Sequence, residues 1–393
     1  MSSSSFRRSL VLLGLGALSV AGCLKTLDES LIDATGGASS GGASGSGGSA
    51  GTGAAGGAGG SGGTTPDAAD GSDGAGGGGI VPYDPKKYPV SNLGSGAAPV
   101  IIAADDTSVF RATKAKVDSL VVSQPTAGGS GTPMPAVEKP QAMVAGAQYL
   151  FVAGGRNTSD EGSITRLPKA GGPKEDVAVT PAPGQATGIH IGADGFVYVT
   201  FNATAAGSVA LMRFEATTTV VQSLYTSSAG GETGGDVVAQ GGCVYWIANG
   251  ALWVSAAGGG ARQSALATPA SDVIGVTADA ASVYYTRAAG SVWRRTLSSS
   301  ACDGGGPAEV ELTNGFTAIG DVIAFDGKIA FTAMGDKAQA YAGGGVFAMP
   351  ATGGNVTQIA PAELGPVDID QSGTFVIFAT DVGPVRKVPK VAQ

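Results

Sequence analysis

The sequence contains only one histidine, His190, and it lacks any run rich in lysine or arginine. Hydrolytic and lyase sites commonly use histidine, so a single imidazole limits the catalytic arrangements that the chain can build. The formal net charge of −8 and the pI near 4.7 argue against binding to nucleic acid or to an anionic surface. After residue 22 there is also no apolar stretch of the roughly 20 residues that a bilayer-spanning helix needs.

The first residues have the pattern of a secretory signal peptide. Arg7 and Arg8 precede an apolar run over 9–20, which is too short for a transmembrane helix. The tetrapeptide Val20-Ala21-Gly22-Cys23 resembles the lipobox of bacterial lipoproteins. This resemblance implies that residues 1–22 are removed and that acyl chains such as palmitate on Cys23 hold the protein on a membrane. No Asp follows Cys23, so we expect an outer-membrane lipoprotein, facing either the periplasm or the cell exterior.

A low-complexity segment separates this anchor from the rest of the chain. Residues 36–79 contain 21 glycines in 44 positions, and the remainder is mostly Ser, Ala and Thr. Such a composition cannot bury enough apolar surface to offset the entropy lost on ordering. We therefore predict a disordered Gly/Ser/Ala-rich tether within 23–79, followed by one folded domain over 80–393.

The region 80–393 repeats an apolar–aromatic strand motif at intervals of 39 to 48 residues. Short apolar runs ending in Asp turns precede each motif, and alternating segments ending in Gly-Gly turns follow it, which predicts four strands per repeat. The second motif positions are Phe110, Phe151, Tyr198, Tyr245, Tyr284, Ala330 and Phe378. The pattern predicts an all-β propeller of seven four-stranded blades, with six or eight left open. The last repeat is one strand short, and we expect residues around 80–90 to supply it.

Two repeats carry a family resemblance. The segments Val244-Tyr245-Trp246-Ile247 and Val283-Tyr284-Tyr285-Thr286 resemble the strands of bacterial YWTD and TolB-type β-propellers. The Asp that closes a YWTD motif is absent after Thr200, Thr286 and Thr332. The resemblance covers most of 80–393 and implies architecture rather than a particular activity.

Aligning the repeats yields one candidate binding site. Asp236, Asp272 and Asp321 each precede the first strand of repeats four, five and six, and in a propeller these positions would converge at one mouth of the central channel. They could receive a cationic ligand or a basic partner. The alternative is that each Asp caps its own loop. His190, in the first strand of repeat three, is interpreted as an ordinary or channel-lining strand residue rather than a catalytic base, and it joins the three aspartates as a candidate binding residue.

The remaining acidic residues are interpreted as turn formers. Asp368-Ile369-Asp370-Gln371-Ser372-Gly373 begins like a calcium loop, but Val376 and Ala379 stand where further oxygen ligands belong, so a turn is favoured. The regular series Asp106, Asp194, Asp279, Asp326 and Asp370 is expected at turns on the opposite face. Neither set predicts a metal site.

Cys243 and Cys302 are the only cysteines left after lipidation of Cys23. They fall in adjacent repeats, and disulfides are permitted outside the cytoplasm. Whether they are bonded stays open from the sequence.

Two functions fit the sequence. The first is a non-catalytic binding or scaffold module for an envelope protein, peptide or glycan, which follows from the missing catalytic constellation and the tethered rigid domain. The second is an extracytoplasmic enzyme: a hydrolase, a lyase or a quinoprotein-like oxidoreductase. We expect a monomer with no cofactor and no nucleic-acid partner, in contact with the membrane through the lipid on Cys23.

Overall fold

The computed structural model describes residues 79–94, 100–114, 117–156, 159–177, 184–218, 220–297, 302, 309–362 and 365–391. The predicted signal peptide, Cys23 and all but the last residue of the predicted tether lie outside these residues. No helix in the described ranges has the length and apolarity needed to cross a membrane.

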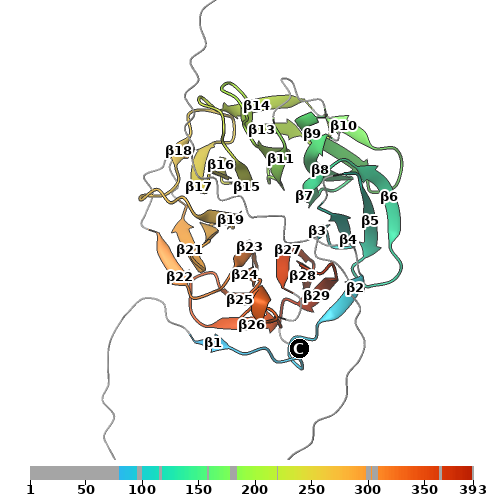
Figure 1. Ribbon diagram of the computed structural model, residues 1–393, viewed down its shortest axis with the longest axis vertical. Coiled ribbons are helices and arrows are strands. Elements are labelled where there is room, and N and C mark those ends of the chain that lie inside the picture. The colour runs from blue at the N-terminus through green and yellow to red at the C-terminus, as the bar shows by residue number, and fades with distance from the viewer. Residues whose placement is uncertain are drawn as a thin grey trace, which may run out of the picture. The chain divides into compact units, whose positions relative to one another are not determined.

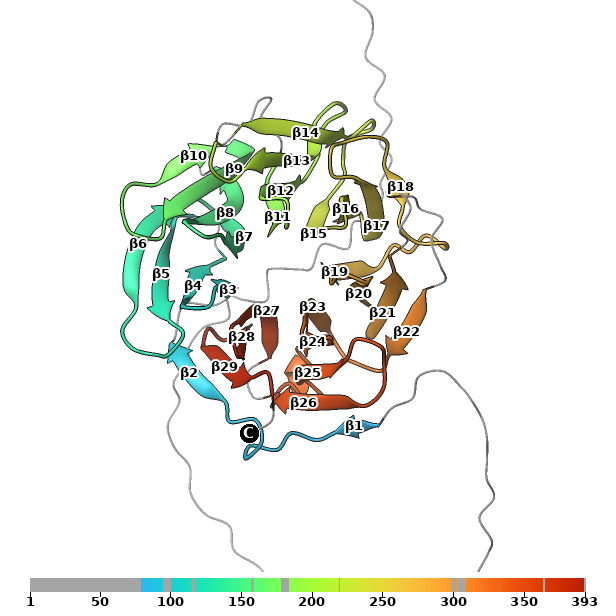
Figure 2. The same cartoon turned by 180° about the vertical axis from the view of Figure 1, so that it is seen from behind.

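The described strands form seven sheets arranged as blades around a central axis (Figures 1 and 2). The four strands of each blade are antiparallel, and one blade carries an additional parallel edge strand, β1. Blade 1 comprises β3 (Val100–Ala104), β4 (Ser108–Thr113), β5 (Ser119–Pro125) and β6 (Thr132–Val137). Blade 2 comprises β7 (Pro140–Ala145), β8 (Tyr149–Arg156), β9 (Ser159–Pro168) and β10 (Glu175–Val177). Blade 3 comprises β11 (Ala186–Ile191), β12 (Phe196–Phe201), β13 (Val209–Glu215) and β14 (Val221–Thr226). Blade 4 comprises β15 (Gly234–Gln240), β16 (Cys243–Ala248), β17 (Ala251–Ala256) and β18 (Gln263–Ser264). Blade 5 comprises β19 (Val273–Ala278), β20 (Ser282–Arg287), β21 (Ser291–Thr296) and β22 (Val310–Thr313).

Blades 6 and 7 complete the ring. Blade 6 comprises β23 (Ile319–Phe325), β24 (Lys328–Ala333), β25 (Gly345–Pro350) and β26 (Val356–Ala360), with a 3₁₀ turn, η2 (Lys337–Gln339), between β24 and β25. Blade 7 comprises β27 (Pro366–Ser372), β28 (Phe375–Thr380), β29 (Val385–Pro389) and, from the other end of the domain, β2 (Ser91–Gly94). The predicted seven-bladed propeller is therefore confirmed.

Apolar side chains are buried between the blades. Seven separate clusters of buried residues occupy the seven interfaces between neighbouring blades. The second strands are apolar on both faces because both faces lie against a neighbour; all six residues of β16 are buried, for example. The ring thus hides the two faces of each sheet, which no single blade could do alone.

The ring closes one segment later than the sequence predicts. The outer strand of blade 7 is β2, which pairs antiparallel with β29 and lies directly after the expected range of 80–90. Within that range, β1 (Ile80–Val81) pairs instead with β26 of blade 6. The intervening residues include Pro82, Pro85 and Pro89, which lack the N–H groups needed for a continuous ladder. The N-terminal segment therefore bridges the outer edges of blades 6 and 7.

Buried threonines of the repeat motif connect one blade to the next. The Thr200 hydroxyl, fully buried in β12 of blade 3, donates to the Gly235 carbonyl in β15 of blade 4. The Thr286 hydroxyl in blade 5 likewise donates to the Gly320 carbonyl in blade 6, at 2.8 Å. Each bond anchors the first strand of the next blade at a glycine, Gly235 or Gly320. The residue directly after that glycine is an aspartate that lines the channel.

Replacing this hydroxyl should destabilise the ring measurably. The Thr200→Val variant keeps the shape of the side chain but leaves the Gly235 carbonyl without its donor, so the free energy of unfolding should fall by about 1–2 kcal/mol. Urea unfolding followed by tryptophan fluorescence would measure the change. Thr226→Val, on the exposed edge strand β14, is the matched control and should stay within about 0.5 kcal/mol of wild type. Equal effects of the two variants would contradict this role.

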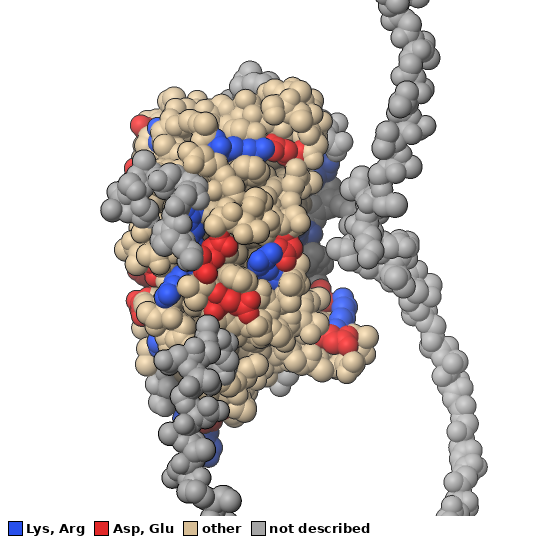
Figure 3. Space-filling model, turned by 90° about the vertical axis from the view of Figure 1, so that its left-hand side faces the viewer, with Lys and Arg blue, Asp and Glu red and all other residues tan. Residues whose placement is uncertain are grey.

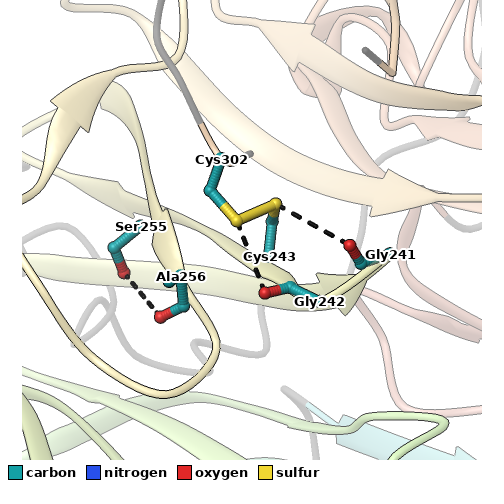
Figure 4. The surroundings of a disulfide bond; sticks show 6 residues. All are labelled: Gly241, Gly242, Cys243, Ser255, Ala256 and Cys302. Carbon is teal, nitrogen blue, oxygen red and sulfur yellow. Dashed lines mark hydrogen bonds between the residues drawn. A yellow bond between two sulfur atoms is a disulfide. The ribbon is translucent and has the colours of Figure 1, made fainter. Parts of the chain in front are cut away.

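A disulfide joins blades 4 and 5. Cys243, the first residue of β16, is bonded to Cys302, which lies between β21 and β22, and their Cα atoms are 5.3 Å apart (Figure 4). The sulfur atoms lie against the backbone of the Gly241–Gly242 turn. The pairing that the sequence left open is thus present in the structure.

Candidate functional site: the central channel

The seven inner strands enclose a cavity of about 510 Å³, which we call the central channel. Its lining is contributed by β3, β7, β11, β15, β19, β23 and β27, the first strand of each blade, together with residue 114 just after β4. The titratable side chains among its lining residues are Lys114, His190, Asp236, Asp321, Asp368 and Asp370. The channel therefore gathers four carboxyl groups and one ammonium group in one space.

Two of the predicted aspartates meet in this channel although they lie two blades apart. Asp321 and Asp236 are linked by a hydrogen bond between their carboxyl groups. Asp321 also accepts from the Val322 N–H at 2.8 Å, and its own N–H donates to the Thr332 hydroxyl at 3.1 Å. The side chains are partly exposed to the channel but lie deep inside the protein.

Burial dominates the electrostatics of this pair. It raises the pKa of Asp236 to about 6, while the hydrogen bond from Asp321 and the charge of Lys114 act in the opposite direction. Burial, and next the charge of Asp236, raise the pKa of Asp321 well above its ordinary value. The pair therefore keeps a proton at a pH at which an isolated aspartate is ionised.

Asp368 and Asp370 contribute the other two carboxyl groups. Asp368 accepts from the Ile102 N–H at 2.8 Å, and Asp370 accepts from the Ala104 N–H at 2.7 Å, so both reach from β27 of blade 7 to β3 of blade 1. Burial raises the pKa of Asp368 to about 7 and that of Asp370 to about 6. Within the described residues, Ile102 and Ala104 are the only residues of β3 whose N–H groups donate to channel carboxylates.

The sequence-based interpretation of this segment was wrong. Asp368 and Asp370 lie within the strand β27, and the turn begins only at Gly373. Asp370 therefore belongs to the channel lining and not to the turn series of the opposite face. One signal in the sequence could have shown this, because Asp370 is followed by two more residues before the Gly turn, whereas Asp326 is followed directly by glycine.

Asp272 does not join Asp236 and Asp321. In blades 4, 5 and 6 a valine of the inner strand pairs with the aromatic residue of the second strand, and the residue before that valine is Asp236, Gly275 and Asp321, respectively. Asp272 lies three residues before Gly275 and forms an ion pair with Arg287, with 2.8 Å between Oδ1 and Nε. It is not among the channel-lining residues, so the shared Asp-Val pattern aligned non-equivalent positions.

His190 does line the channel. Burial lowers the pKa of its imidazole to about 4, partly offset by the charge of Asp194 and by a hydrogen bond to the backbone of Ala239. The ring is therefore neutral near pH 7. Asp194 itself accepts a hydrogen bond from the Tyr198 hydroxyl at 2.6 Å.

Asp194 and Asp279, two aspartates of the repeated series, stabilise turns as expected. Asp194 accepts from the Phe196 N–H, and Asp279 accepts from the N–H groups of Ala281 and Ser282. The Tyr284 hydroxyl donates to Asp279, as Tyr198 does to Asp194. Within the described ranges, no group of three or more His, Cys, Asp and Glu side chains is placed to hold a metal ion.

The outer rim differs from the channel. On the side that carries parts of blades 4 and 5, most surface residues are uncharged, and the charged residues occur in small groups of both signs (Figure 3). The described residues of this face therefore form no extended patch of one charge, whereas the channel concentrates carboxyl groups.

Comparisons with known proteins support the fold alone. No model of a known protein family and no curated protein matches the chain. Among solved structures, virginiamycin B lyase from Staphylococcus aureus is similar, with a TM-score of 0.59 and 15% identity over 78% of this chain and 99% of that chain. The WD40 domain of Pan2 from Neurospora crassa has a TM-score of 0.53 and 8% identity over 79% and 97%, respectively. The computationally designed protein Ika8 has a TM-score of 0.53 at 12% identity, over 76% and 98%.

Proposed function

We propose that this chain is a cell-envelope lipoprotein whose propeller is a non-catalytic binding or scaffold module for a protein, peptide or glycan, with the central channel as its recognition site. The observation that carries this proposal is the gathering of Asp236, Asp321 and Asp368 around one solvent-accessible cavity. Their raised pKa values mean that ionising them costs folding free energy near neutral pH. Groups that cost stability are commonly retained for function.

Export and anchoring are supported by two separate features of the chain. The Val20-Ala21-Gly22-Cys23 segment resembles a lipobox, and the Cys243–Cys302 disulfide suits an oxidising compartment. The absence of an Asp after Cys23 favours the outer membrane.

Cys23→Ser should abolish lipidation and release the protein from the membrane. Wild type expressed in a Gram-negative host should incorporate labelled palmitate and partition into the detergent phase of Triton X-114, whereas the variant should do neither. Cys302→Ser is the matched cysteine control and should behave as wild type in both assays. Membrane retention of an unlabelled Cys23→Ser protein would refute the lipoprotein assignment.

The binding function is tested by capture that depends on the channel. Asp236→Asn combined with Asp321→Asn removes the carboxylate charge with little change in shape. Glu215→Gln, on the exposed end of β13, is the matched acid-to-amide control. Purified full-length proteins should retain an envelope component that the double variant loses at least tenfold and the control keeps. Equal retention by all three proteins would contradict a role for the channel.

An enzyme is the second candidate, because His190 lies in the same channel. The lyase with a similar fold has also been crystallised as a catalytically inactive histidine-to-alanine variant with quinupristin. In the present chain, however, His190 hydrogen-bonds the backbone of Ala239, and Asp194, the carboxylate whose charge acts on His190, is engaged by Tyr198. These contacts favour binding over acid–base chemistry. Ligand turnover that is lost in His190→Gln, with ligand affinity unchanged, would favour the enzyme.

A further inference from the structure

We propose that the Cys243–Cys302 disulfide is a site of reversible thiol–disulfide exchange. A small external thiol opens it in the folded protein, and opening it loosens β22, the outer strand of blade 5. This inference goes beyond the proposed binding function and does not depend on it. It follows from the place of the bond in the ring, from the unequal exposure of its two cysteines and from the carbonyl groups that face its sulfur atoms.

The bond lies at an interface where ring closure does not require it. The other six interfaces have no disulfide, because Cys23 is the only further cysteine in the sequence. The two ends of the propeller meet in blade 7, where a cross-link would enclose nearly the whole domain and restrict the unfolded chain most. Cys243 and Cys302 instead join consecutive blades and are 59 residues apart in the sequence. The position is therefore not the one that favours the greatest stabilisation.

Apolar packing holds blades 4 and 5 together independently of the bond. The cluster between them contains side chains of both blades, among them Leu252 and Val254 of β17 and Val283 and Tyr285 of β20, each at most 1% exposed. Burial of this kind is the main favourable contribution to folding. The two blades should therefore stay in contact when the disulfide is reduced.

The two cysteines differ in exposure, which sets the order of the exchange. Cys302 is half-buried, whereas Cys243 is only 9% exposed. An external thiolate therefore forms its bond with Cys302 Sγ, the bond between the two cysteines breaks, and Cys243 leaves as a thiolate that takes a proton from water. A second thiolate attacks the external sulfur of this mixed disulfide and releases Cys302. In total the protein disulfide is reduced to two thiols while two external thiols are oxidised to one disulfide, and the reverse steps restore the bond.

Backbone carbonyl groups face both sulfur atoms. The Gly241 oxygen lies 3.9 Å from Cys243 Sγ, and the Gly242 oxygen lies 3.4 Å from Cys302 Sγ (Figure 4). A disulfide sulfur carries no hydrogen, whereas a thiol has a weak S–H donor. These carbonyl groups can therefore accept hydrogen bonds from the reduced cysteines and not from the oxidised ones. The turn between β15 and β16 thus offers the reduced state contacts that partly offset the loss of the covalent bond.

The strand β22 is the element that the bond restrains. Cys302 precedes it in the chain, so the disulfide attaches this part of blade 5 to blade 4. β22 has four residues, pairs with β21 on one side and begins at Val310, which is 40% exposed. A second attachment comes from the Glu309 carboxylate, which accepts from the Ala267 N–H at 2.7 Å. Reduction removes the covalent attachment and leaves a single exposed hydrogen bond beside the short ladder to β21.

Mass spectrometry of alkylated thiols measures the exchange in the folded protein. The full chain with Cys23→Ser is incubated with 2-mercaptoethanol at pH 8, so that every thiol counted belongs to Cys243 or Cys302. Reduction should proceed without unfolding, so adding Thr200→Val should leave its rate unchanged. If the bond opened only through global unfolding, the weaker ring of Thr200→Val would react roughly five- to thirtyfold faster. Thr226→Val is again the matched control.

Hydrogen–deuterium exchange then locates the change. The amides of β22 should exchange severalfold faster in the reduced protein, whereas those of β13 in blade 3 should keep their protection. Cys302→Ser should reproduce the reduced pattern in the absence of thiol. Oxidised glutathione added after removal of the thiol should restore the protection of β22 in the reduced chain.

The outcomes separate exchange in the folded protein from a purely structural disulfide. Equal rates in the parent chain and in Thr200→Val, together with selective and reversible loosening of β22, support the proposal. Faster reduction of Thr200→Val, or reduction that occurs only when denaturant is added, overturns it. Loss of protection in β13 overturns it as well, because reduction would then unfold the ring, and so does unchanged protection of β22.

Discussion

A chain that begins at Val100 is expected to be at least about 3 kcal/mol less stable than one that begins at Gly79, because it lacks β2. Leu93 of β2 is 3% exposed and packs with Ile377 and Val385 in the cluster between blades 7 and 1. Losing such a buried leucine costs roughly 2–5 kcal/mol, and the ladder to β29 is lost with it. Urea unfolding would measure the difference, and size-exclusion chromatography would report an opened or aggregated ring.

A third chain separates the contribution of β2 from that of the residues before it. A chain that begins at Lys87 lacks β1, whose two residues are exposed, but keeps β2 together with Tyr88 and Val90, which pack against the cluster between blades 6 and 7. It should lose less than about 1 kcal/mol relative to the chain that begins at Gly79. If it instead unfolds as readily as the chain that begins at Val100, then residues 79–86 and not β2 close the ring. Leu93→Asp in the full chain should reproduce the larger loss.

Asp321→Asn is expected to stabilise the protein at pH 8 by about 1–2 kcal/mol and to leave it near wild-type stability at pH 4. Burial raises the pKa of Asp321 above 3.8, and that of Asp236 to about 6. The folded protein therefore holds protons that the unfolded chain releases above pH 4. The stability contributed by these protons is fully present below about pH 4 and is lost as the pH rises through the folded-state pKa values.

The neighbouring charges set the window of this effect. Asp236, Asp368 and Asp370, with pKa values of about 6 to 7, and the cation Lys114 all face the same channel, and Lys390 acts on Asp370. The difference in unfolding free energy between Asp321→Asn and wild type should therefore grow as the pH rises above about 4, the pKa of an unperturbed aspartate. Chemical denaturation at several pH values measures it. A variant that is less stable than wild type at pH 8 would show that the carboxylate is needed structurally.

The architecture was predictable because every blade of a propeller repeats the same pattern of apolar strands. Seven strand motifs with similar spacing must bury two apolar faces each, and only stacking of the blades achieves this, as β16 shows. The closing strand was harder to place, because Ser91–Gly94 has one buried apolar residue, Leu93, and carries no motif. Its identity depends on a ladder with β29, nearly three hundred residues away.

The candidate site was predictable only in part, because its geometry depends on bulges. The inner strands of blades 4, 5 and 6 each contain a register shift before the valine that pairs with the aromatic residue of the second strand. Sequence alignment by the Asp-Val pattern matched Asp272 with Asp236, whereas the ladder matches Gly275 with it. Thr200 was likewise interpreted through its resemblance to YWTD repeats, although its hydroxyl holds the strand before Asp236. Contacts between blades leave no signal in the local pattern.

Photo-crosslinking inside the channel tests the central claim most directly. Ile274 lines the channel and is 40% exposed, so p-benzoylphenylalanine at this position can reach a bound partner. The same photoreactive residue at Leu120, on the outer part of blade 1, is the control. The account predicts a crosslinked product from position 274 that disappears when Asp236 and Asp321 are changed to Asn. A product from position 120 alone, or one from 274 that persists in the double variant, would contradict it.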